Sequence, residues 1–252
     1  ELDALPGVAA QVAAARDAIA AVRRLPENRR TWAKTAAAAG IRAARASAML
    51  DGGSAAVAVS ESAVSQSARS GDAGEHAPEL VADPVLAGAL RVSAAIGELA
   101  AVWGRAPLQA LARLHTLAAA DLAAEHELGR PRPEVTARLA ALAEVVVAAP
   151  WSGPVQVAVV YGELLTTRPF ETANGVVARA AARLTMVTSG LDPQALTAPE
   201  VGYLRTQTEA AARMTEFVAG TADGVAGWIG YVCRALETGA REARGVARAA
   251  AE

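Results

Sequence analysis

The stretch RPFETANGVVAR, residues 168–179, is the most informative part of this 252-residue chain. Asn174 and Gly175 can form a tight turn, because both residue types tolerate left-handed backbone angles at little cost. The apolar run from Val176 to Val187 then predicts a helix. Backbone N–H groups that converge at the start of a helix bind anions, with help from the helix dipole. The stretch therefore predicts a phosphate-binding loop that leads into a helix.

This stretch resembles the signature of the Fic (Fido) family, HPFx[D/E]GNGRxxR. Five residues match in register and without a gap: Pro169, Phe170, Asn174, Gly175 and Arg179. The resemblance implies an all-α, Fic-like helical bundle. It also implies a site in which the family binds ATP with magnesium and transfers AMP to a hydroxyl group.

The departures from the signature fall on the reactive positions. Arg168 replaces the family's general base, a histidine, and a guanidinium is not deprotonated in proteins. Thr172 replaces the acidic magnesium ligand, and a hydroxyl is a much weaker ligand. Ala173 replaces the first glycine and Val176 the first arginine, so only Arg179 remains to meet a phosphate or a carboxylate. We expect no catalytic residue, no metal ligand and no ordinary AMP transfer here.

Flanking segments support the resemblance. Tyr161 stands on the apolar segment 155–165, at a place where the family often carries a histidine. Leu114 and His115, followed by the segment GRPR at 129–132, resemble an earlier LH…GxxR region of the family. These matches imply the same helix-loop-helix layout.

A second motif, SAMLDG at residues 47–52, resembles the [S/T]xxxE[G/N] pattern of the inhibitory helix in many Fic proteins. In the family, its glutamate pairs with the second signature arginine and blocks placement of the ATP γ-phosphate. Asp51 and Arg179 supply both halves of that pair. The resemblance implies a regulatory role for Ser47, Asp51 and Gly52, in the subgroup whose inhibitor precedes the core. Aspartate is one methylene shorter, so we expect a looser or water-mediated bridge.

Each motif also has a plainer interpretation. An Arg-Pro-Phe-Glu turn before Asn-Gly is common between helices, with Phe170 as a core residue. Arg179 can be a surface residue paired with an acid, and Gly52 can simply end a helix. The two motifs in this order favour the Fic-like fold, but they do not favour activity.

Composition narrows the remaining classes. The chain is 53% hydrophobic and only 4% aromatic, which favours closely packed helices. Its 24 basic and 26 acidic residues are intermixed, without a basic stripe for nucleic acid. Arg241, Arg244 and Arg248 are interpreted as a solvated helix face. The single cysteine, Cys233, suits a reducing compartment. We find no signal peptide and no uninterrupted apolar stretch of about 18 residues, so we expect a cytoplasmic protein without a membrane partner.

Other chemistries lack support. The three histidines, His76, His115 and His126, do not stand near cysteine or carboxylate residues at a metal-ligand spacing, so a zinc site is not expected. The sequence also lacks a G-x-S-x-G motif, a Walker loop and a dinucleotide glycine fingerprint.

The chain divides into three predicted parts. Residues 1–52 hold two helices and the inhibitory-like motif, and residues 85–252 form the Fic-like core with its C-terminal helices. Residues 53–84, rich in Ser, Gly, Ala and Asp, are predicted to be a flexible loop or flap. Within it, Val57-Ala58-Val59-Ser60 alternates as one arm of a short β-hairpin would. The main helices before the signature are expected at 8–24, 29–50, 85–103, 107–126 and 134–149.

The leading hypothesis is a pseudoenzyme, a binding or regulatory module with a protein partner. It would retain a weak pocket for ATP or another phosphate-bearing ligand, formed by Arg168, Ala173, Asn174, Gly175 and Arg179. The alternative is an active nucleotidyl- or phospho-transferase with altered chemistry, in which Arg168 binds phosphate, since a guanidinium suits that role. A third hypothesis is a structural subunit whose alanine-rich N-terminal helices form a homo-oligomer interface.

Overall fold

The structure, a computed structural model, describes residues 2–55 and 83–251, and within these ranges it is all-α. The candidate hairpin arm at 57–60 lies outside the described residues. The helices are α1 (Val8–Arg23), α2 (Asn28–Leu50), α4 (Pro84–Trp103), α5 (Pro107–Ala119), α6 (Thr136–Ala148), α7 (Gly153–Thr167), α8 (Asn174–Thr188), α9 (Pro199–Arg205), α10 (Gln207–Val218) and α11 (Ala222–Ala251). Short 3-10 turns lie at Leu2–Ala4, Glu125–Glu127 and Pro133–Val135.

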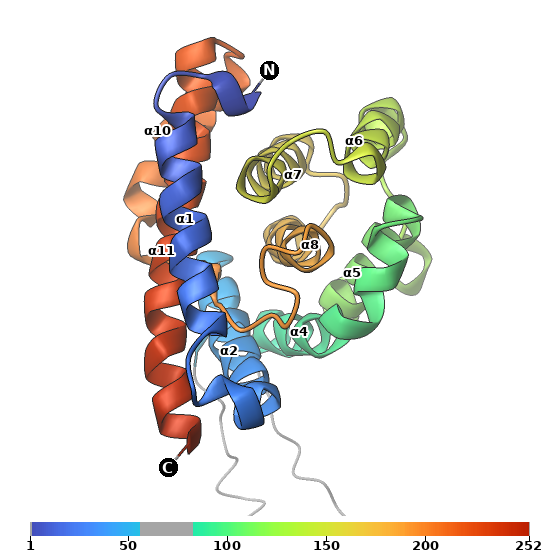
Figure 1. Cartoon of the computed structure of the whole chain (residues 1–252). Coiled ribbons are helices and arrows are strands. Elements are labelled where there is room, and N and C mark those ends of the chain that lie inside the picture. Colours follow the sequence, from blue (N-terminus) through green and yellow to red (C-terminus); the bar gives the residue numbers. More distant parts are fainter. Residues whose placement is uncertain (1, 56–82, 252) are drawn as a thin grey trace, which may run out of the picture.

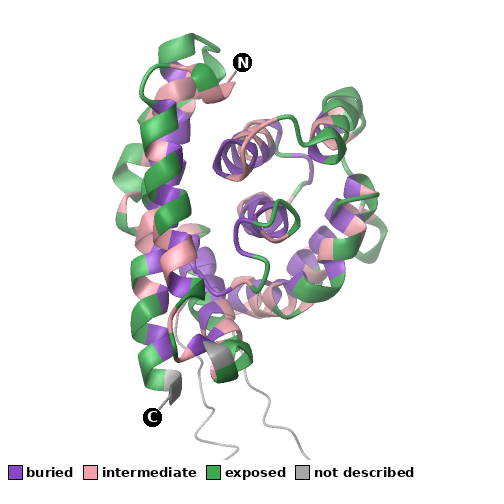
Figure 2. Ribbon diagram, in the orientation of Figure 1, coloured by how far each residue is buried: buried purple, intermediate pink, exposed green. Residues whose placement is uncertain are grey.

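Helix α8 lies at the centre of the molecule, and α7, α4, α5 and α2 pack around it (Figure 1). Every residue from Val176 to Met186 is buried (Figure 2). Four of these are alanines, whose small side chains let the neighbouring helices approach closely. Two are arginines, Arg179 and Arg183. A charged group is rarely buried without a partner, so these two side chains mark where α8 meets polar groups of other helices.

Helices α1 and α11 lie side by side along one edge of the molecule, with the two chain termini at opposite ends (Figure 1). Helix α1 buries Val8, Val12, Ile19 and Val22, which recur at helical spacing along one face. These residues belong to the same hydrophobic core as α8. The N-terminal helix is therefore packed into the body of the protein.

Asp83 joins the end of α2 to the start of α4. Its Oδ1 accepts the backbone N–H of Leu86 at 2.8 Å and so caps α4, while its Oδ2 accepts the N–H of Ser54 at 2.7 Å. These hydrogen bonds, the one from Leu86 first, lower the pKa of Asp83. A Cβ atom on Gly53 would lie 2.9 Å from Asp83 Oδ1, so the close approach needs glycine.

The predicted helix at 107–126 is too long, because α5 ends at Ala119. The N–H groups of Leu122 and Ala123 both bond to the Ala119 carbonyl as the chain turns away. It must turn there to return to α5, where the N–H of Gly129 donates to His115 Nδ1 at 2.9 Å. A tertiary contact thus ends this helix at a place where the local sequence has no helix breaker.

Helix α4 is long and apolar enough to cross a membrane by length and composition alone, with a mean hydropathy of 1.6 over 18 residues. In the structure it packs against α2, α5 and α8 and buries Leu86, Val92, Ile96 and Trp103. Its Gly88 lies so close to α5 that a Cβ atom would come within 2.1 Å of a backbone carbonyl oxygen. These contacts bury about a third of the 18-residue window, and most of the helix's other residues are half-buried.

Candidate functional site

The loop between α7 and α8 is closed by Asn174. Its Nδ2 donates to the Phe170 carbonyl at 2.6 Å, and its Oδ1 accepts the Phe170 N–H at 2.9 Å. Arg168 and Ala173, at the two ends of the loop, have left-handed φ angles of 44° and 54°. The left-handed turn residue expected at Asn174 or Gly175 is thus Ala173. A side chain in this conformation costs roughly 1 kcal/mol, so the loop is held in shape by its contacts.

Two of those contacts come from α5 and from the segment that follows it. The ring of His115 stacks on Phe170, with centroids 4.0 Å apart and planes 3° apart. The backbone N–H of Arg132 donates to the Pro169 carbonyl at 2.8 Å. The Arg132 guanidinium donates to the carbonyls of Thr167 and Arg168. The LH…GxxR region that the sequence singled out therefore packs directly against the loop.

The end of α2 meets the start of α8 through Asp51. Its Oδ2 accepts the backbone N–H of Val176 at 3.0 Å, and its Oδ1 accepts from Arg179 Nη2 at 2.8 Å. Ala173, which precedes α8, supplies no side-chain cap, so Asp51 serves as the anion at this helix N-terminus. The expectation of a looser or water-mediated bridge is wrong. A Cβ atom on Gly175 would lie 2.2 Å from Asp51 Oδ1, and without one α2 comes close enough for the shorter aspartate.

Arg179 is buried, with 4% of its side chain exposed, so its interpretation as a surface residue is excluded. Its Nε donates to Ser47 Oγ at 2.8 Å, and its Nη2 donates to the Ser47 carbonyl at 2.9 Å. Burial alone would lower the pKa of Arg179, but the Asp51 carboxylate and the Tyr161 hydroxyl outweigh it and raise that pKa. Burial also raises the pKa of Tyr161, against the effect of the guanidinium. Arg179 is therefore a fixed positive charge among neutral and anionic partners.

Two predicted site residues, Arg168 and Gly52, contribute no side-chain contact to this cluster. The Arg168 side chain is exposed and has no hydrogen bond or ion pair within the described part of the chain. Gly52 has φ 82° and an open Cβ position, typical of a glycine that ends a helix. Val176 contributes its backbone to the site, while its side chain is buried in the core.

The magnesium that the resemblance implies does not fit these residues. Thr172, at the position of the acidic ligand, has a buried Oγ1 without a hydrogen-bond partner among residues 2–55 and 83–251.

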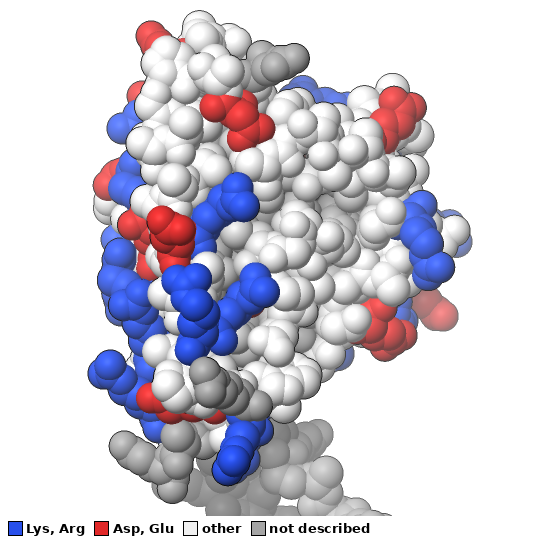
Figure 3. All heavy atoms as spheres, in the orientation of Figure 1, with Lys and Arg blue, Asp and Glu red and all other residues white. Residues whose placement is uncertain are grey.

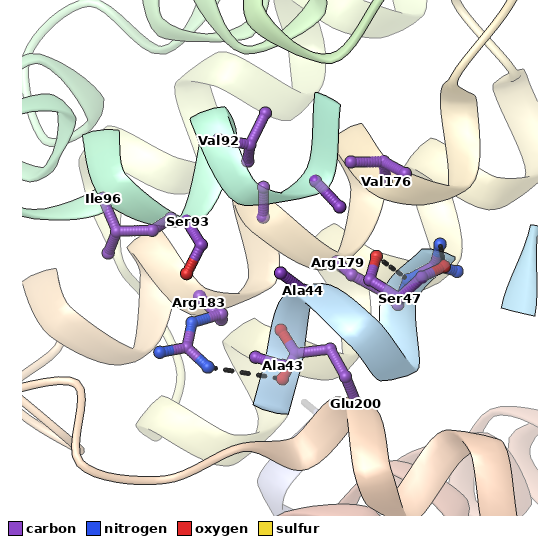
Figure 4. A pocket seen from close by; sticks show the side chains of 12 residues that line it. Ala43, Ala44, Ser47, Val92, Ser93, Ile96, Val176, Arg179, Arg183 and Glu200 are labelled. Atoms are coloured by element: carbon purple, nitrogen blue, oxygen red, sulfur yellow. Dashed lines mark hydrogen bonds and ion pairs between the residues drawn. The ribbon is translucent and has the colours of Figure 1, made fainter. Parts of the chain in front are cut away.

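A small cavity lies behind Arg179, between α2, α4, α8 and α9 (Figure 4). Its volume is about 20 Å³, which is room for roughly one water molecule. Arg183 and Glu200 line it and form a buried ion pair of 3.3 Å. A nucleotide is too large for this space.

The arrangement of these helices is that of known structures. The structure of C. elegans Fic-1 superposes with a TM-score of 0.66 at 15% sequence identity. The match covers 95% of this chain and 72% of the Fic-1 chain. The chain has the Fic fold. A Fic family protein from Desulfovibrio desulfuricans G20 matches with a TM-score of 0.65 and 17% identity, over 95% of this chain and 74% of that one. No family model and no curated protein matches the sequence.

The Fic fold confirms the predicted fold class. Sequence identities of 15% and 17% support a shared fold but not a shared function. The function of this chain must therefore be argued from its own residues. Those residues bring the two motifs together: Ser47 and Asp51 from α2 meet Gly175 and Arg179 from α8.

Proposed function

We propose that this chain is a catalytically degenerate Fic-like protein, a binding or regulatory module with an anion site at the start of α8. One observation carries the proposal. The Asp51 carboxylate accepts from a helix N-terminal N–H at 3.0 Å and from a buried guanidinium at 2.8 Å. A phosphate oxygen pair would make the same two contacts. Asp51 therefore acts as an internal anion that competes with a phosphate-bearing ligand.

The residues argue against group transfer. Arg168 cannot accept a proton from a target hydroxyl, and loss of a general base costs roughly 10²–10⁴-fold in rate. Val176 offers no guanidinium to phosphates, and Thr172 offers no carboxylate to a metal. The charge that develops during phosphoryl or nucleotidyl transfer would thus lack most of its stabilisation.

Competition from within the chain sets the expected affinity. A tethered group acts at an effective concentration in the millimolar range or above. A ligand therefore displaces Asp51 only if its dissociation constant for the site without Asp51 lies below the millimolar range. Removal of the Asp51 carboxylate should strengthen phosphate binding by roughly tenfold or more.

Calorimetry tests the proposal. Inorganic phosphate, ATP and other nucleotides are titrated, with and without magnesium, into the protein and into Asp51→Ala, after circular dichroism confirms that the variant is folded. We expect binding to Asp51→Ala and weaker binding to the unmodified protein. The double variant Asp51→Ala/Arg179→Met should not bind phosphate or nucleotides. Asp121→Ala, which removes an exposed carboxylate paired with Arg91, is the matched control.

Two results would contradict the proposal. The first is that phosphate and nucleotides bind neither protein. The second is transfer of AMP to the protein or to a partner that is lost when Asn174 or Arg179 is substituted, since this would make the chain an active transferase.

We further propose a cytoplasmic location. Cys233 is fully buried and forms no disulfide. Burial raises the pKa of its thiol to about 12, so the thiol is neutral and is compatible with a reducing compartment. Recovery of the native protein from a secreted fraction would count against this location.

A further inference from the structure

Basic side chains gather where α1 ends, α2 begins and α11 ends (Figure 3). We call this surface the basic end, and its residues are Arg23, Arg24, Arg30, Lys34, Arg244 and Arg248. All six are exposed. Within residues 2–55 and 83–251, none of the six forms an ion pair with a carboxylate. A surface of this charge stands out on a chain whose formal net charge is -2.

Two acidic residues of α11 in this region already have partners, while Glu27, directly before α2, has a buried Oε2 without a hydrogen-bond partner among the described residues and offsets part of the positive charge. Glu242 pairs with Arg42 at 3.2 Å, which ties α11 to α2, and also with Arg205 at 3.6 Å. Glu237 pairs with Arg241 at 3.8 Å. Positive charges within a Debye length of about 10 Å add to one local potential. The basic end is therefore a concentrated positive field available to an anionic partner.

We propose that the basic end binds single-stranded nucleic acid. Five of its six residues are arginine, whose planar guanidinium matches phosphate geometry. Trp32, between Arg30 and Lys34 in α2, exposes 44% of its surface, whereas Trp103 and Trp228 are buried. An exposed indole next to arginines suits base stacking, the usual sequence-tolerant mode for single strands.

A lipid surface fits the same residues less well. A helix that lies in a membrane interface needs a continuous apolar face. Around Arg30 and Lys34 the exposed large hydrophobic residue is Trp32 alone among the described side chains, and the next on α2 is Ile41, more than two turns away. The charges also come from three helices that lie far apart in sequence, which is why no basic stripe is visible along the chain.

The test is fluorescence anisotropy of a labelled oligothymidine of about 20 nucleotides at several salt concentrations. With six phosphate contacts, log K should fall with log salt at a slope of about -4. Arg244→Gln/Arg248→Gln should reduce that slope by about 1.4. Trp32→Phe should weaken binding about fivefold or more and abolish any oligonucleotide-dependent quenching of its fluorescence.

Controls separate this site from the anion site at α8. Arg105→Gln/Arg113→Gln removes two positive charges from α5 and the turn before it, and should leave both slope and affinity unchanged. Asp51→Ala should also leave them unchanged, so failure of either proposal leaves the other standing. The proposal is overturned if the oligonucleotide does not bind at about 50 mM salt, or if the control pair lowers the slope as much as the α11 pair does. Binding to vesicles rich in phosphatidylserine, without binding to the oligonucleotide, would also overturn it.

Discussion

At the scale of single residues, the contact between Gly175 and Asp51 predicts strong coupling. In Gly175→Ala the new methyl group would overlap the Asp51 carboxylate and expel it, leaving the buried Arg179 without its counter-ion. We expect a loss of about 2–3 kcal/mol in the free energy of unfolding, measured with urea.

A double-mutant cycle checks the cause. Asp51→Gly destabilises the protein, but it also removes the group that the new methyl would hit. The combined variant should therefore lose at least about 1 kcal/mol less than the sum of the single losses. Strictly additive losses would show that Asp51 does not occupy the place above Gly175.

His115 gives a prediction about pH. Burial lowers its pKa, with a smaller opposite effect from Glu127. The unfolded chain takes up a proton near pH 6.5 while the folded ring stays neutral. The free energy of unfolding therefore has its full value above that pH and decreases as the pH falls below it. The loss is at most about 1.4 kcal/mol per pH unit. Urea unfolding of the parent, of His115→Gln and of the exposed control His126→Gln should show that only His115→Gln flattens this dependence.

One contact of the site, the Asp51–Arg179 pair, could be predicted from the sequence. The resemblance of two motifs, more than a hundred residues apart, to the inhibitory and signature motifs of the Fic family implied this pair. The bond from the Val176 N–H could not be foreseen, since a backbone group leaves no mark in a sequence. The left-handed Ala173 was also missed, because alanine favours helices and gives no sign of strain.

At the scale of elements, the ion pair between Arg183 and Glu200 joins α8 to α9. Both side chains are buried, at 7% and 3% exposed. Glu200→Gln leaves a buried arginine without a counter-ion, and we expect a loss of about 3–5 kcal/mol in urea unfolding.

The same pair provides its own controls. Arg183→Met/Glu200→Leu removes both charges and should cost less than Glu200→Gln alone. Glu163→Gln breaks the exposed pair with Arg138 and should cost no more than about 1 kcal/mol. Equal losses in the buried and exposed pairs would contradict this account of α9.

Helix boundaries were predictable where proline or a turn residue stands. Pro84, Pro107 and Pro199 each begin a helix, as their fixed φ favours. The end of α5 was not predictable, because the contact of Gly129 with His115 decides it.

At the scale of the whole molecule, α1 belongs to the common core. Ile19 is fully buried, so Ile19→Ala should lower the free energy of unfolding by about 2–5 kcal/mol in a single cooperative transition. Ile41→Ala on α2 makes the same change at a residue 47% exposed and should cost less than about 1 kcal/mol. A small loss at Ile19, or a separate early transition, would mean that α1 unfolds independently.

The bonds from Asp83 to Ser54 and Leu86 also bear on how this protein can be altered. Because these bonds set the two ends of the intervening segment beside each other, its length does not fix the distance between α2 and α4. Each doubling of a closed loop adds only about 0.6 kcal/mol of entropy cost. A reporter domain inserted directly after residue 55 would thus leave both Asp83 bonds in place, a few residues from Asp51.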